Sequence, residues 1–295
     1  MKKKLDFYFD FIKKKFLERE INSLAKKYIN QNYLRMATIS YDGISNYTNI
    51  YGFYENEIIL TLKEIFKKNK INNYFIDVGA NYGTYSLYFS KNFRKVYSIE
   101  AAPKMFKLLQ INCEYFKNIK TFNVAVSDNQ LSKFFYIDNK NFGANSLIKK
   151  RFNKKIKVKC DTLDRLINKQ NIKNSFIKID TEGSEINVLK GMKKIFKSQN
   201  LIIGIEQLDE EFYAKDELMT SNCIEFLKKN KFKYFYEIKV NEWRYNYIFL
   251  SKLFKILEII FFVKPYTKIK FKKIYNFEKK IYQQIICSRT ALKII

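Results

Sequence analysis

The sequence contains no histidine among its 295 residues, and this absence removes several kinds of chemistry. Histidine general bases, Ser-His triads and zinc sites with histidine ligands are all excluded. Acid–base chemistry must therefore come from carboxylates, lysine, tyrosine or cysteine. The four cysteines lie far apart and form no CxxC pair. This spacing argues against a zinc knuckle or a thioredoxin-like motif and is typical of reduced structural thiols.

Long apolar segments are also missing. In the N-terminal stretch MKKKLDFYFDFIKKKFLERE, charges at Asp6, Asp10 and Lys13 interrupt the apolar part, so it is not a signal peptide. Near the other end, the longest uninterrupted run of KLFKILEIIFFVK covers only residues 259–263. A membrane-spanning helix needs roughly 18 apolar residues. We therefore expect a cytoplasmic protein without a transmembrane segment.

The chain carries an excess of positive charge, with 56 Lys and Arg against 29 Asp and Glu, a formal net charge of +27. Such a charge would favour nucleic acid, anionic lipid or acidic substrates. However, the lysines are scattered, and the chain is rich in Lys, Asn, Ile, Phe and Tyr with only 2 Pro and 8 Gly. Codon bias produces this composition without a polyanionic partner, so we interpret most of the charge as solvated surface.

From Tyr74 onward, apolar strand segments such as YFIDVGA, KVYSIEA, SFIKIDTEG and NLIIGIEQ alternate with helical segments. This alternation predicts an α/β protein with a doubly wound, mostly parallel, Rossmann-like sheet of seven strands. FKYFYEIKV and RYNYIFLSK, joined by NEW, predict a hairpin that supplies a terminal antiparallel strand. The predicted domain spans residues 71–252, with a helical cap over 1–70 and a basic, aromatic, helical tail over 253–295.

The segment FIDVGANYGTYSL predicts a strand, a glycine turn and a helix. In place of the GxGxxG of dinucleotide sites it has Gly79 and Gly83 with Asn81 between them, and no P-loop string GxxxxGK[ST] exists. Asp77, on the strand, is a poor neighbour for a diphosphate but suits an ammonium or sulfonium group. Glu100 ends the next strand, where doubly wound folds direct a carboxylate at ribose hydroxyls.

These features together predict a site for an adenosine with a cationic, phosphate-free tail, and S-adenosylmethionine has that chemistry. Ser127 and Asp128 follow the third predicted strand, at the position where such folds contact the adenine amino group. A plain turn is the alternative interpretation for these two residues. The predicted cofactor-binding residues are Asp77, Gly79, Asn81, Gly83, Glu100, Ser127 and Asp128.

A second group of acids follows the buried strand in IKIDTEGSE. Glu185 has the simpler alternative role of charging the N-terminus of the following helix. We expect Asp180 to be the catalytic base or orienting group, with Glu206, at the end of LIIGIEQ, beside it. The two acids could instead share a Mg²⁺ ion. We do not favour that alternative and assign no metal site.

The sequence resembles the FkbM-type S-adenosylmethionine-dependent methyltransferases of the class I fold. The matching strings occur in order over roughly residues 52–207 and are GFYENE, FIDVGANYGTYSL, YSIEAAP, NVAVSDN, VKCDTLDRL and FIKIDTEGSEINVLKGM. The resemblance implies methyl transfer to a hydroxyl oxygen of a sugar, a glycan or another small metabolite. It also implies that Glu55 lies near the site. IEAAP stands where the family usually has an FEP-like string, and the family's common histidines are absent.

Two other functional classes remain open at this stage. A nucleic-acid (RNA) methyltransferase would use the basic surface, but no NPPY-like base-flipping motif is present and a nucleic-acid partner is not favoured. A non-catalytic interaction protein would not need Asp77, Glu100 and Asp180. The lysine-rich tail also allows peripheral membrane contact, because lysines flank its apolar segment.

Overall fold

The computed structural model describes most of the chain from residue 54 onward and a few residues before it. The described residues are 15, 36–39, 44, 45, 48, 54–138, 142–148, 154–167, 172–206, 219–242, 267–277 and 284–293. None of the helices in this part of the chain combines the length and apolar character that crossing a bilayer requires.

The centre of the molecule is an eight-stranded sheet with the strand order β11-β10-β12-β9-β8-β1-β2-β3. Its strands are β1 (Tyr74–Val78), β2 (Lys95–Glu100), β3 (Ile119–Asn123), β8 (Ser175–Ile179), β9 (Leu201–Glu206), β10 (Tyr234–Glu242), β11 (Thr267–Ile274) and β12 (Gln284–Ser288). The five strands from β3 to β9 are parallel, and β12 runs antiparallel to both of its neighbours. The predicted doubly wound, mostly parallel architecture is thus confirmed, with eight strands in place of seven.

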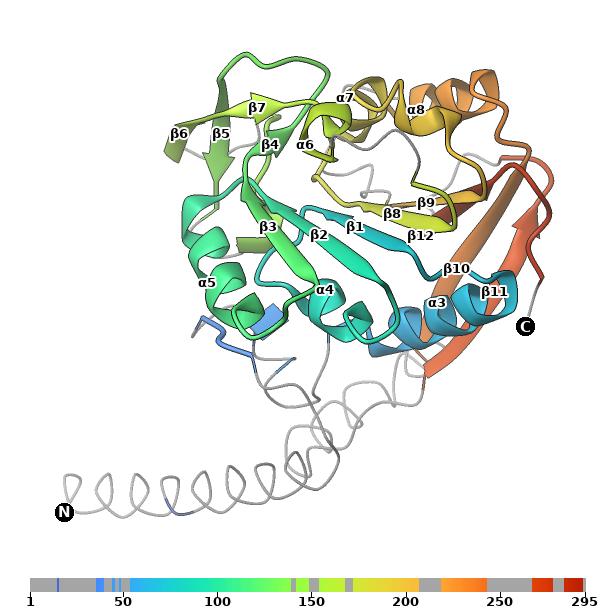
Figure 1. Ribbon diagram of the computed structural model, residues 1–295, viewed down its shortest axis with the longest axis horizontal. Helices are drawn as coiled ribbons and strands as arrows, with labels where there is room; N and C mark the ends of the chain where they lie inside the picture. The colour runs from blue at the N-terminus through green and yellow to red at the C-terminus, as the bar shows by residue number, and fades with distance from the viewer. Residues whose placement is uncertain are drawn as a thin grey trace, which may run out of the picture.

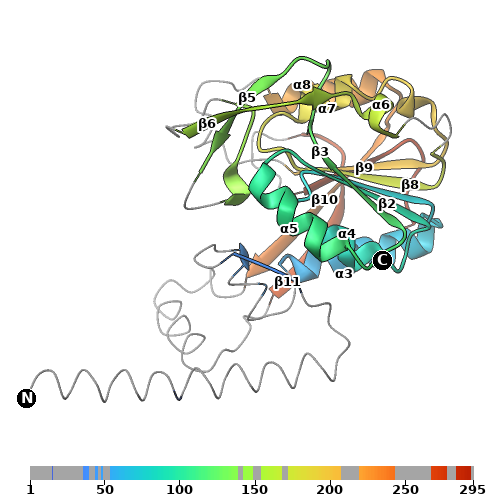
Figure 2. The ribbon, with the colours of Figure 1, turned by 60° about the vertical axis from the view of Figure 1, so that its left-hand side comes forward.

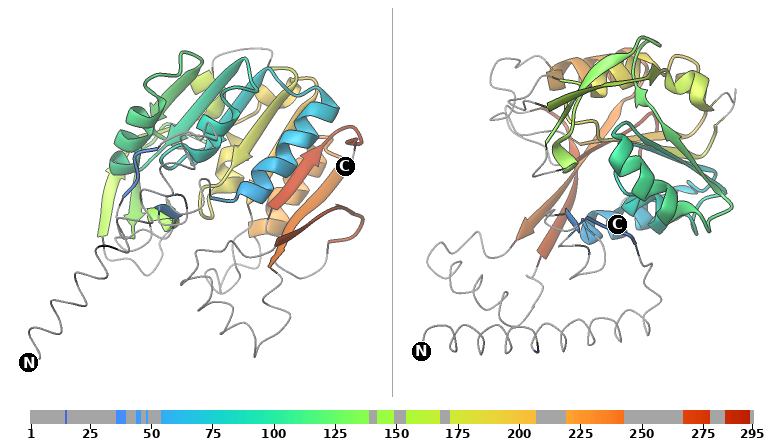
Figure 3. Two further views of the ribbon diagram at one scale, coloured as in Figure 1. Left: turned by 90° about the horizontal axis from the view of Figure 1, so that it is seen from below. Right: turned by 90° about the vertical axis from the view of Figure 1, so that its left-hand side faces the viewer.

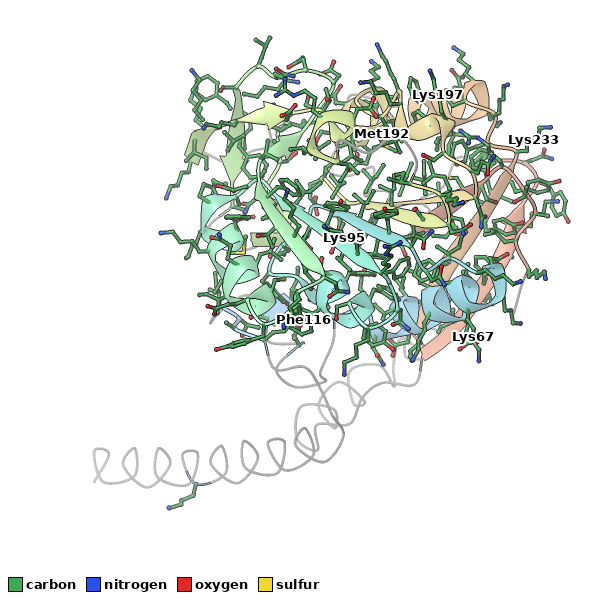
Figure 4. The ribbon with its side chains drawn as sticks, in the orientation of Figure 1. Lys67, Lys95, Phe116, Met192, Lys197 and Lys233 are labelled. Carbon is green, nitrogen blue, oxygen red and sulfur yellow. The ribbon has the colours of Figure 1, made fainter. Side chains whose placement is uncertain are left out.

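Helices cover both faces of the sheet (Figures 1 and 2). Among the described residues, α3 (Asn56–Asn69), α4 (Thr84–Phe89) and α5 (Pro103–Cys113) lie on one face. The other face is covered by α6 (Leu163–Ile167), α7 (Glu185–Lys190) and α8 (Met219–Lys229) (Figure 1). Each layer encloses an apolar core. In Figure 4 the fully buried side chain of Met192 lies inside one layer, whereas those of Lys67, Lys197 and Lys233 point outward.

The central strands are apolar on both faces, as expected for a parallel sheet covered by helices. Residues 175–179 of β8 are all buried, including Lys178. In the register, Asp77 of β1 lies beside Lys178, which in turn lies beside Gly204 of β9. After β1 the chain winds outward to β2 and β3, and it later returns to β8 on the other side of β1. Ligands of open α/β sheets bind at such a switch point, at the carboxyl ends of the strands.

The predicted helical tail is wrong for the described residues of 253–295, because β11 and β12 both come from this segment. TKIKFKKI alternates lysine with apolar residues at a period of two, which is the pattern of a half-buried edge strand. QIICS is short and fully buried, as a central strand is. Figure 3 shows β10 and β11 side by side with α3 packed against them. The apolar stretch expected to contact a membrane, 253–263, lies outside the described residues.

The predicted closing hairpin also needs correction. Its first strand corresponds to β10, but the predicted second strand, 244–252, lies outside the described residues. The partners that the structure gives β10 are β11 on one side and β12 on the other, both antiparallel. The predicted terminal antiparallel strand is therefore β11, at the edge of the sheet, and β12 is a second antiparallel strand inserted between β9 and β10.

Two small sheets extend beyond β3 (Figure 1). A parallel pair joins β4 (Ala125–Val126) to β7 (Cys160–Asp161), and an antiparallel pair joins β5 (Lys133–Ile137) to β6 (Lys154–Val158). The short 3-10 helix η1 (Phe142–Ala144) lies in the connection between β5 and β6, and η2 (Ile195–Lys197) precedes β9. Phe135 packs with the start of α5 in a separate apolar cluster.

Candidate active site

The turn between β1 and α4 requires glycine at two positions. Gly79 has a φ of 85°, and a Cβ built on it would lie 1.7 Å from the backbone carbonyl oxygen of Asp180. Gly83 precedes α4 with a φ of 101°, and its Cβ would lie 2.8 Å from Cδ1 of Leu109. Asn81, between them, adopts the left-handed conformation that asparagine tolerates better than most residues. The G-x-N-x-G spacing therefore allows the turn to pass close to β8 and α5.

Asp77 is fully buried near the end of β1, and only one of its two carboxylate oxygens accepts a hydrogen bond from the described residues. Its Oδ2 accepts a hydrogen bond of 2.7 Å from the hydroxyl of Ser86, which itself accepts one of 2.6 Å from Ser98. Its Oδ1 accepts no hydrogen bond from the described residues. Burial raises the pKa of this carboxyl group. A buried acceptor oxygen without a donor is costly, so Asp77 is suited to a cationic ligand group.

Glu100 ends β2 and is held by the backbone. Its Oε2 accepts the N–H of Asn81 at 2.9 Å and its Oε1 accepts the N–H of Ala102 at 2.7 Å. Each oxygen retains a further acceptor position. Burial raises the pKa of Glu100 to about 7, against the opposing effect of the two N–H groups. The carboxylate is thereby fixed in one orientation, which suits a pair of neighbouring hydroxyl groups.

One pocket is lined by four of the five predicted residues from Asp77 to Glu100, and Gly83 is the one that does not line it. It is also lined by Tyr54, Ile99, Val124, Val126, Phe135 and the loop after η1. Among the described residues, acids dominate its charged lining, with Glu55, Asp77, Glu100, Asp180, Glu182 and Glu206 against one basic residue, Lys178. A strongly basic protein thus has an acidic pocket.

Ser127 and Asp128 do not line this pocket, although Val126 before them does. Ser127 is completely buried, and its hydroxyl donates to Asp128 Oδ1 at 3.0 Å. The ammonium of Lys133 donates to Ser127 at 2.7 Å and lies 3.4 Å from Asp128. These bonds connect the end of β4 to the start of β5, as a structural turn would. A contact of either residue with adenine stays a prediction.

Asp180 and Glu206 lie side by side at the carboxyl ends of β8 and β9, which are neighbouring parallel strands. Burial and the nearby charges of Asp180 and Glu55 raise the pKa of Glu206 well above its usual range. Glu206 therefore holds its proton more readily than an ordinary glutamate does. Their catalytic role stays a prediction.

Lys178 is a residue of this site that the sequence analysis missed. Its side chain is 3% exposed, and its ammonium lies 2.6 Å from Asp180 Oδ2 and 4.7 Å from the centroid of the Tyr85 ring. The charges of Asp180 and Asp77, and then of the two glutamates, raise the pKa of Lys178 above its usual range. The available signal was a lysine within the apolar strand FIKI, because a buried lysine requires a partner.

The residues before α3 complete the pocket. Tyr85 donates a hydrogen bond of 2.7 Å to Glu55 Oε2, and burial raises the pKa of Glu55. Glu55 has a φ of 57°, an uncommon conformation for a residue with a side chain. Farther upstream, Ala37 exchanges two backbone hydrogen bonds with the side chain of Asn112, at 2.6 and 3.0 Å. The expected position of Glu55 near the site is confirmed.

The hydrogen bonds of Glu185 give it a structural role in the loop before α7. Its Oε1 accepts the N–H groups of Thr181 and Gly183, at 3.1 and 3.0 Å, and the Thr181 hydroxyl at 3.1 Å. These bonds hold the loop between Asp180 and α7 in place. Among the described residues, no group of three or more His, Cys, Asp or Glu side chains is arranged to hold a metal ion.

The pocket fits S-adenosylmethionine at two points. The partnerless Oδ1 of Asp77 would accept the ammonium of the methionine part, and Glu100 would accept the ribose hydroxyls. A doubly wound sheet with an antiparallel strand inserted near one end, and this pocket at its switch point, define the class I methyltransferase architecture. Residues 77–242, more than half of the chain, match the Methyltransferase FkbM domain, so the protein belongs to this family and is an S-adenosylmethionine-dependent methyltransferase.

The comparisons with individual proteins are much weaker. No curated protein matches the chain. The precorrin-6y C5,15-methyltransferase of Geobacter metallireducens is 10% identical, with a TM-score of 0.43, over 87% of this chain and 95% of that chain. An O-methyltransferase of Bacillus cereus in complex with SAH is 9% identical, with a TM-score of 0.38 and 91% and 89% coverage. An rRNA methylase of Streptococcus thermophilus is 8% identical, with a TM-score of 0.38 and 82% and 99% coverage. These similarities do not identify the acceptor.

Proposed function

We propose that the protein transfers a methyl group from S-adenosylmethionine to a hydroxyl oxygen of a sugar, a glycan or another small metabolite. The observation that supports this proposal is the carboxyl pair of Asp180 and Glu206 beside the cofactor-binding turn. An alcohol must lose its proton as it attacks, and a carboxylate is a suitable base in a protein without histidine.

The residues of the pocket have different roles in methyl transfer. The bound cofactor supplies an activated methyl group, so the chain needs only to align the acceptor and to take up its proton. Asp77 and Glu100 hold the cofactor at the β1 and β2 side of the pocket. Asp180 orients the acceptor hydroxyl and accepts its proton, and Glu206 lies beside it. Alignment alone supplies several kcal/mol, up to about 7–11 kcal/mol for well-oriented reactants.

The charge of the pocket supports a neutral acceptor over RNA. Of the residues that the structure describes, six acidic side chains and one basic side chain, Lys178, line it. A phosphodiester backbone brought to this opening would meet charges of its own sign in a partly desolvated site, which is unfavourable. A sugar hydroxyl carries no such charge. The net charge of +27 is the observation that favours RNA, but it describes the chain as a whole.

Two measurements, made one after the other, test the proposal. Thermal shifts with S-adenosylmethionine, S-adenosylhomocysteine and NAD come first, and stabilisation by NAD alone would overturn the cofactor assignment. Transfer of a radiolabelled methyl group to a panel of free sugars, oligosaccharides and RNA transcripts then identifies the acceptor class. We expect label in a carbohydrate or small-metabolite fraction, and its loss in Asp180→Asn but not in the exposed control Glu225→Gln. Label in RNA alone, with steep salt dependence, would replace the proposal by the nucleic-acid alternative.

A further inference from the structure

Lys178 is a buried cation at a position where the strand would fold equally well with an apolar residue. Its neighbours along β8, Phe176, Ile177 and Ile179, are all apolar and at most 1% exposed. Burying an ammonium costs several kcal/mol even when it is paired, and replacing a buried ion pair by apolar residues is often neutral or stabilising. The ion pair of Lys178 and Asp180 is therefore not needed to stabilise the strand, which points to a role in the site.

Lys178 lies between the predicted cofactor-binding residue Asp77 and the candidate base Asp180. The register places it beside Asp77 and beside Gly204, which has no side chain. Its ammonium lies 2.6 Å from Asp180 Oδ2. The ring of Tyr85, on α4, packs against the ammonium, and the Tyr85 hydroxyl donates a hydrogen bond to Glu55. These neighbours of Lys178 are thus acidic or, as for Tyr85, hydrogen-bonded to an acid.

The charges around Lys178 cannot all be present at once. Four carboxyl groups face this one ammonium, from β1, from the residue before α3, and from the ends of β8 and β9. They are Asp77, Glu55, Asp180 and Glu206. Neighbouring like charges in a desolvated site drive protonation of all but the best-paired group. Asp180 makes the direct ion pair, and its partner Glu206 is the one with the strongly raised pKa.

We propose that Lys178 is a positioning residue of the transfer reaction, whose ion pair of 2.6 Å holds the carboxylate of Asp180 oriented toward the acceptor, with Glu206 beside it. This inference rests on the proposed function, because Asp180 is useful as a base only if the acceptor must lose a proton. Proton transfer to Asp180 would leave a neutral acid beside Lys178, and Glu206 would keep its proton throughout.

The first test needs no acceptor. Carbon NMR of carboxyl-labelled aspartate and glutamate reports how many protons the pair holds, with the signals assigned by their loss in Asp180→Asn and Glu206→Gln. Near about pH 7 we expect one proton on the pair in the wild type and in Lys178→Arg, and two in Lys178→Met. Lys120→Met, an exposed lysine of β3, is the matched control and should resemble the wild type. A single proton in Lys178→Met would overturn the proposal.

The second test uses the acceptor identified by the methyl-transfer panel. Lys178→Met should lower turnover by about 100-fold or more and move the acid limb of the pH–rate profile to higher pH. Affinity for S-adenosylhomocysteine should change much less, and Lys178→Arg should recover part of the turnover. A merely structural role would instead lower thermal stability and cofactor affinity together without moving the acid limb, and that result would contradict the proposal.

Two further outcomes are distinguishable. If Lys178→Met does not fold, the double variant Lys178→Met/Asp180→Leu removes both buried charges and should fold. Its glutamate spectrum then reports Glu206 without either neighbouring charge. Loss of Asp180 lowers the pKa of Glu206 and loss of Lys178 raises it; because Asp180 has the larger effect, Glu206 should ionise more readily than in the wild type. An unchanged Glu206 signal would contradict the proposed interaction of the two acids. If the wild type methylates no hydroxyl acceptor, the proposed function fails while the NMR proton count still decides the role of Lys178.

Discussion

The backbone carbonyl oxygen of Asp180 lies in the space that any side chain on residue 79 would need. A Cβ on Gly79 would meet this oxygen at 1.7 Å, and the N–H of Asp180 donates to the carbonyl of Val78 at 3.0 Å. The cofactor-binding turn and the candidate base are therefore built against each other. Two motifs that are separated by a hundred residues in the sequence form one structure, in which a displacement of either displaces the other.

The variant Gly79→Ala tests this coupling. Alanine is disfavoured at a φ of 85°, and its methyl group would push the turn away from Asp180. We expect a loss of about 2 kcal/mol or more in the free energy of unfolding, together with a loss of cofactor binding. Chemical denaturation and calorimetry with S-adenosylhomocysteine measure the two effects. Unchanged values for both would mean that the turn is free to move away from β8.

Asp77→Asn removes the charge of Asp77 but keeps the shape of its side chain. Asparagine keeps an oxygen for the Ser86 hydroxyl but has no charge to offer an ammonium group. We expect affinity for S-adenosylhomocysteine to fall by about 10- to 100-fold, as for the loss of a charged hydrogen bond worth about 1.5–3 kcal/mol. The ligand-free variant should be at least as heat-stable as the wild type, because a buried ionisable group is removed.

Ser86→Ala is the matched control for that experiment. It removes the donor to Oδ2 of Asp77 and leaves the charge in place. Affinity should fall less than in Asp77→Asn, and stability should fall because a buried carboxylate loses its hydrogen bond. Equal losses of affinity in the two variants would indicate that the charge of Asp77 does not contact the ligand.

The sequence was sufficient to predict the parts of the site that follow from strand ends. Asp77, Glu100, Asp180 and Glu206 each end or follow an apolar strand, and parallel strands bring their carboxyl ends to one edge. Glycine spacing likewise identified the turn, because the positions that need positive φ accept few other residues. These are local patterns whose consequences in space are fixed by the fold class.

The residues that the sequence analysis missed depend on contacts between distant segments. Lys178 reads as one lysine among many in a chain with 56 Lys and Arg, and only its register beside Asp77 shows that it is buried among acids. The tail was misjudged for a related reason. TKIKFKKI could be an edge strand or a polar helix face until its pairing with β10 is known. Short segments of this kind take their structure from their partners.

Asp180→Asn and Glu206→Gln test the catalytic assignment. Asparagine still accepts a hydrogen bond but cannot take up the acceptor proton, so turnover should fall by about 100- to 10,000-fold. Affinity for S-adenosylhomocysteine should be nearly unchanged. Glu206→Gln should have a smaller effect, because a neutral amide can replace a protonated carboxyl group as donor. Methyl-transfer assays measure both, and unchanged turnover in Asp180→Asn would remove Asp180 from the mechanism.

Arg289 stabilises the end of β12 at a distance from the pocket. Its guanidinium donates to the backbone carbonyls of Phe196, Ser198 and Asn230 and lies 4.8 Å from the centroid of the Phe232 ring. Arg289→Ala should lower the free energy of unfolding by about 2–3 kcal/mol, because these carbonyls lose a charged donor. Cofactor affinity should not change. The exposed Lys233, mutated to alanine, is the control, and equal stability of the two variants in urea would contradict this role.

The titration of Glu100 affects folding and binding in opposite directions. Burial raises its pKa from 4.5 to about 7, so between these values the folded protein holds a proton that the unfolded chain has lost. The contribution of Glu100 to the stability of the ligand-free protein is therefore fully present below 4.5 and is lost as the pH rises through about 7. Ribose hydroxyls, in contrast, donate to the ionised carboxylate, so binding should favour the deprotonated form.

We therefore expect affinity for S-adenosylhomocysteine to increase by about tenfold between pH 6 and pH 8, since the ionised fraction of a group with a pKa near 7 rises by about that factor. Calorimetry in buffers of different ionisation enthalpy should detect release of up to about half a proton on binding near pH 7, because Glu100 is half ionised there without ligand. In Glu100→Gln the affinity should be lower and nearly independent of pH. A tenfold increase that persists in Glu100→Gln would assign the titration to another group of the pocket, such as Asp77.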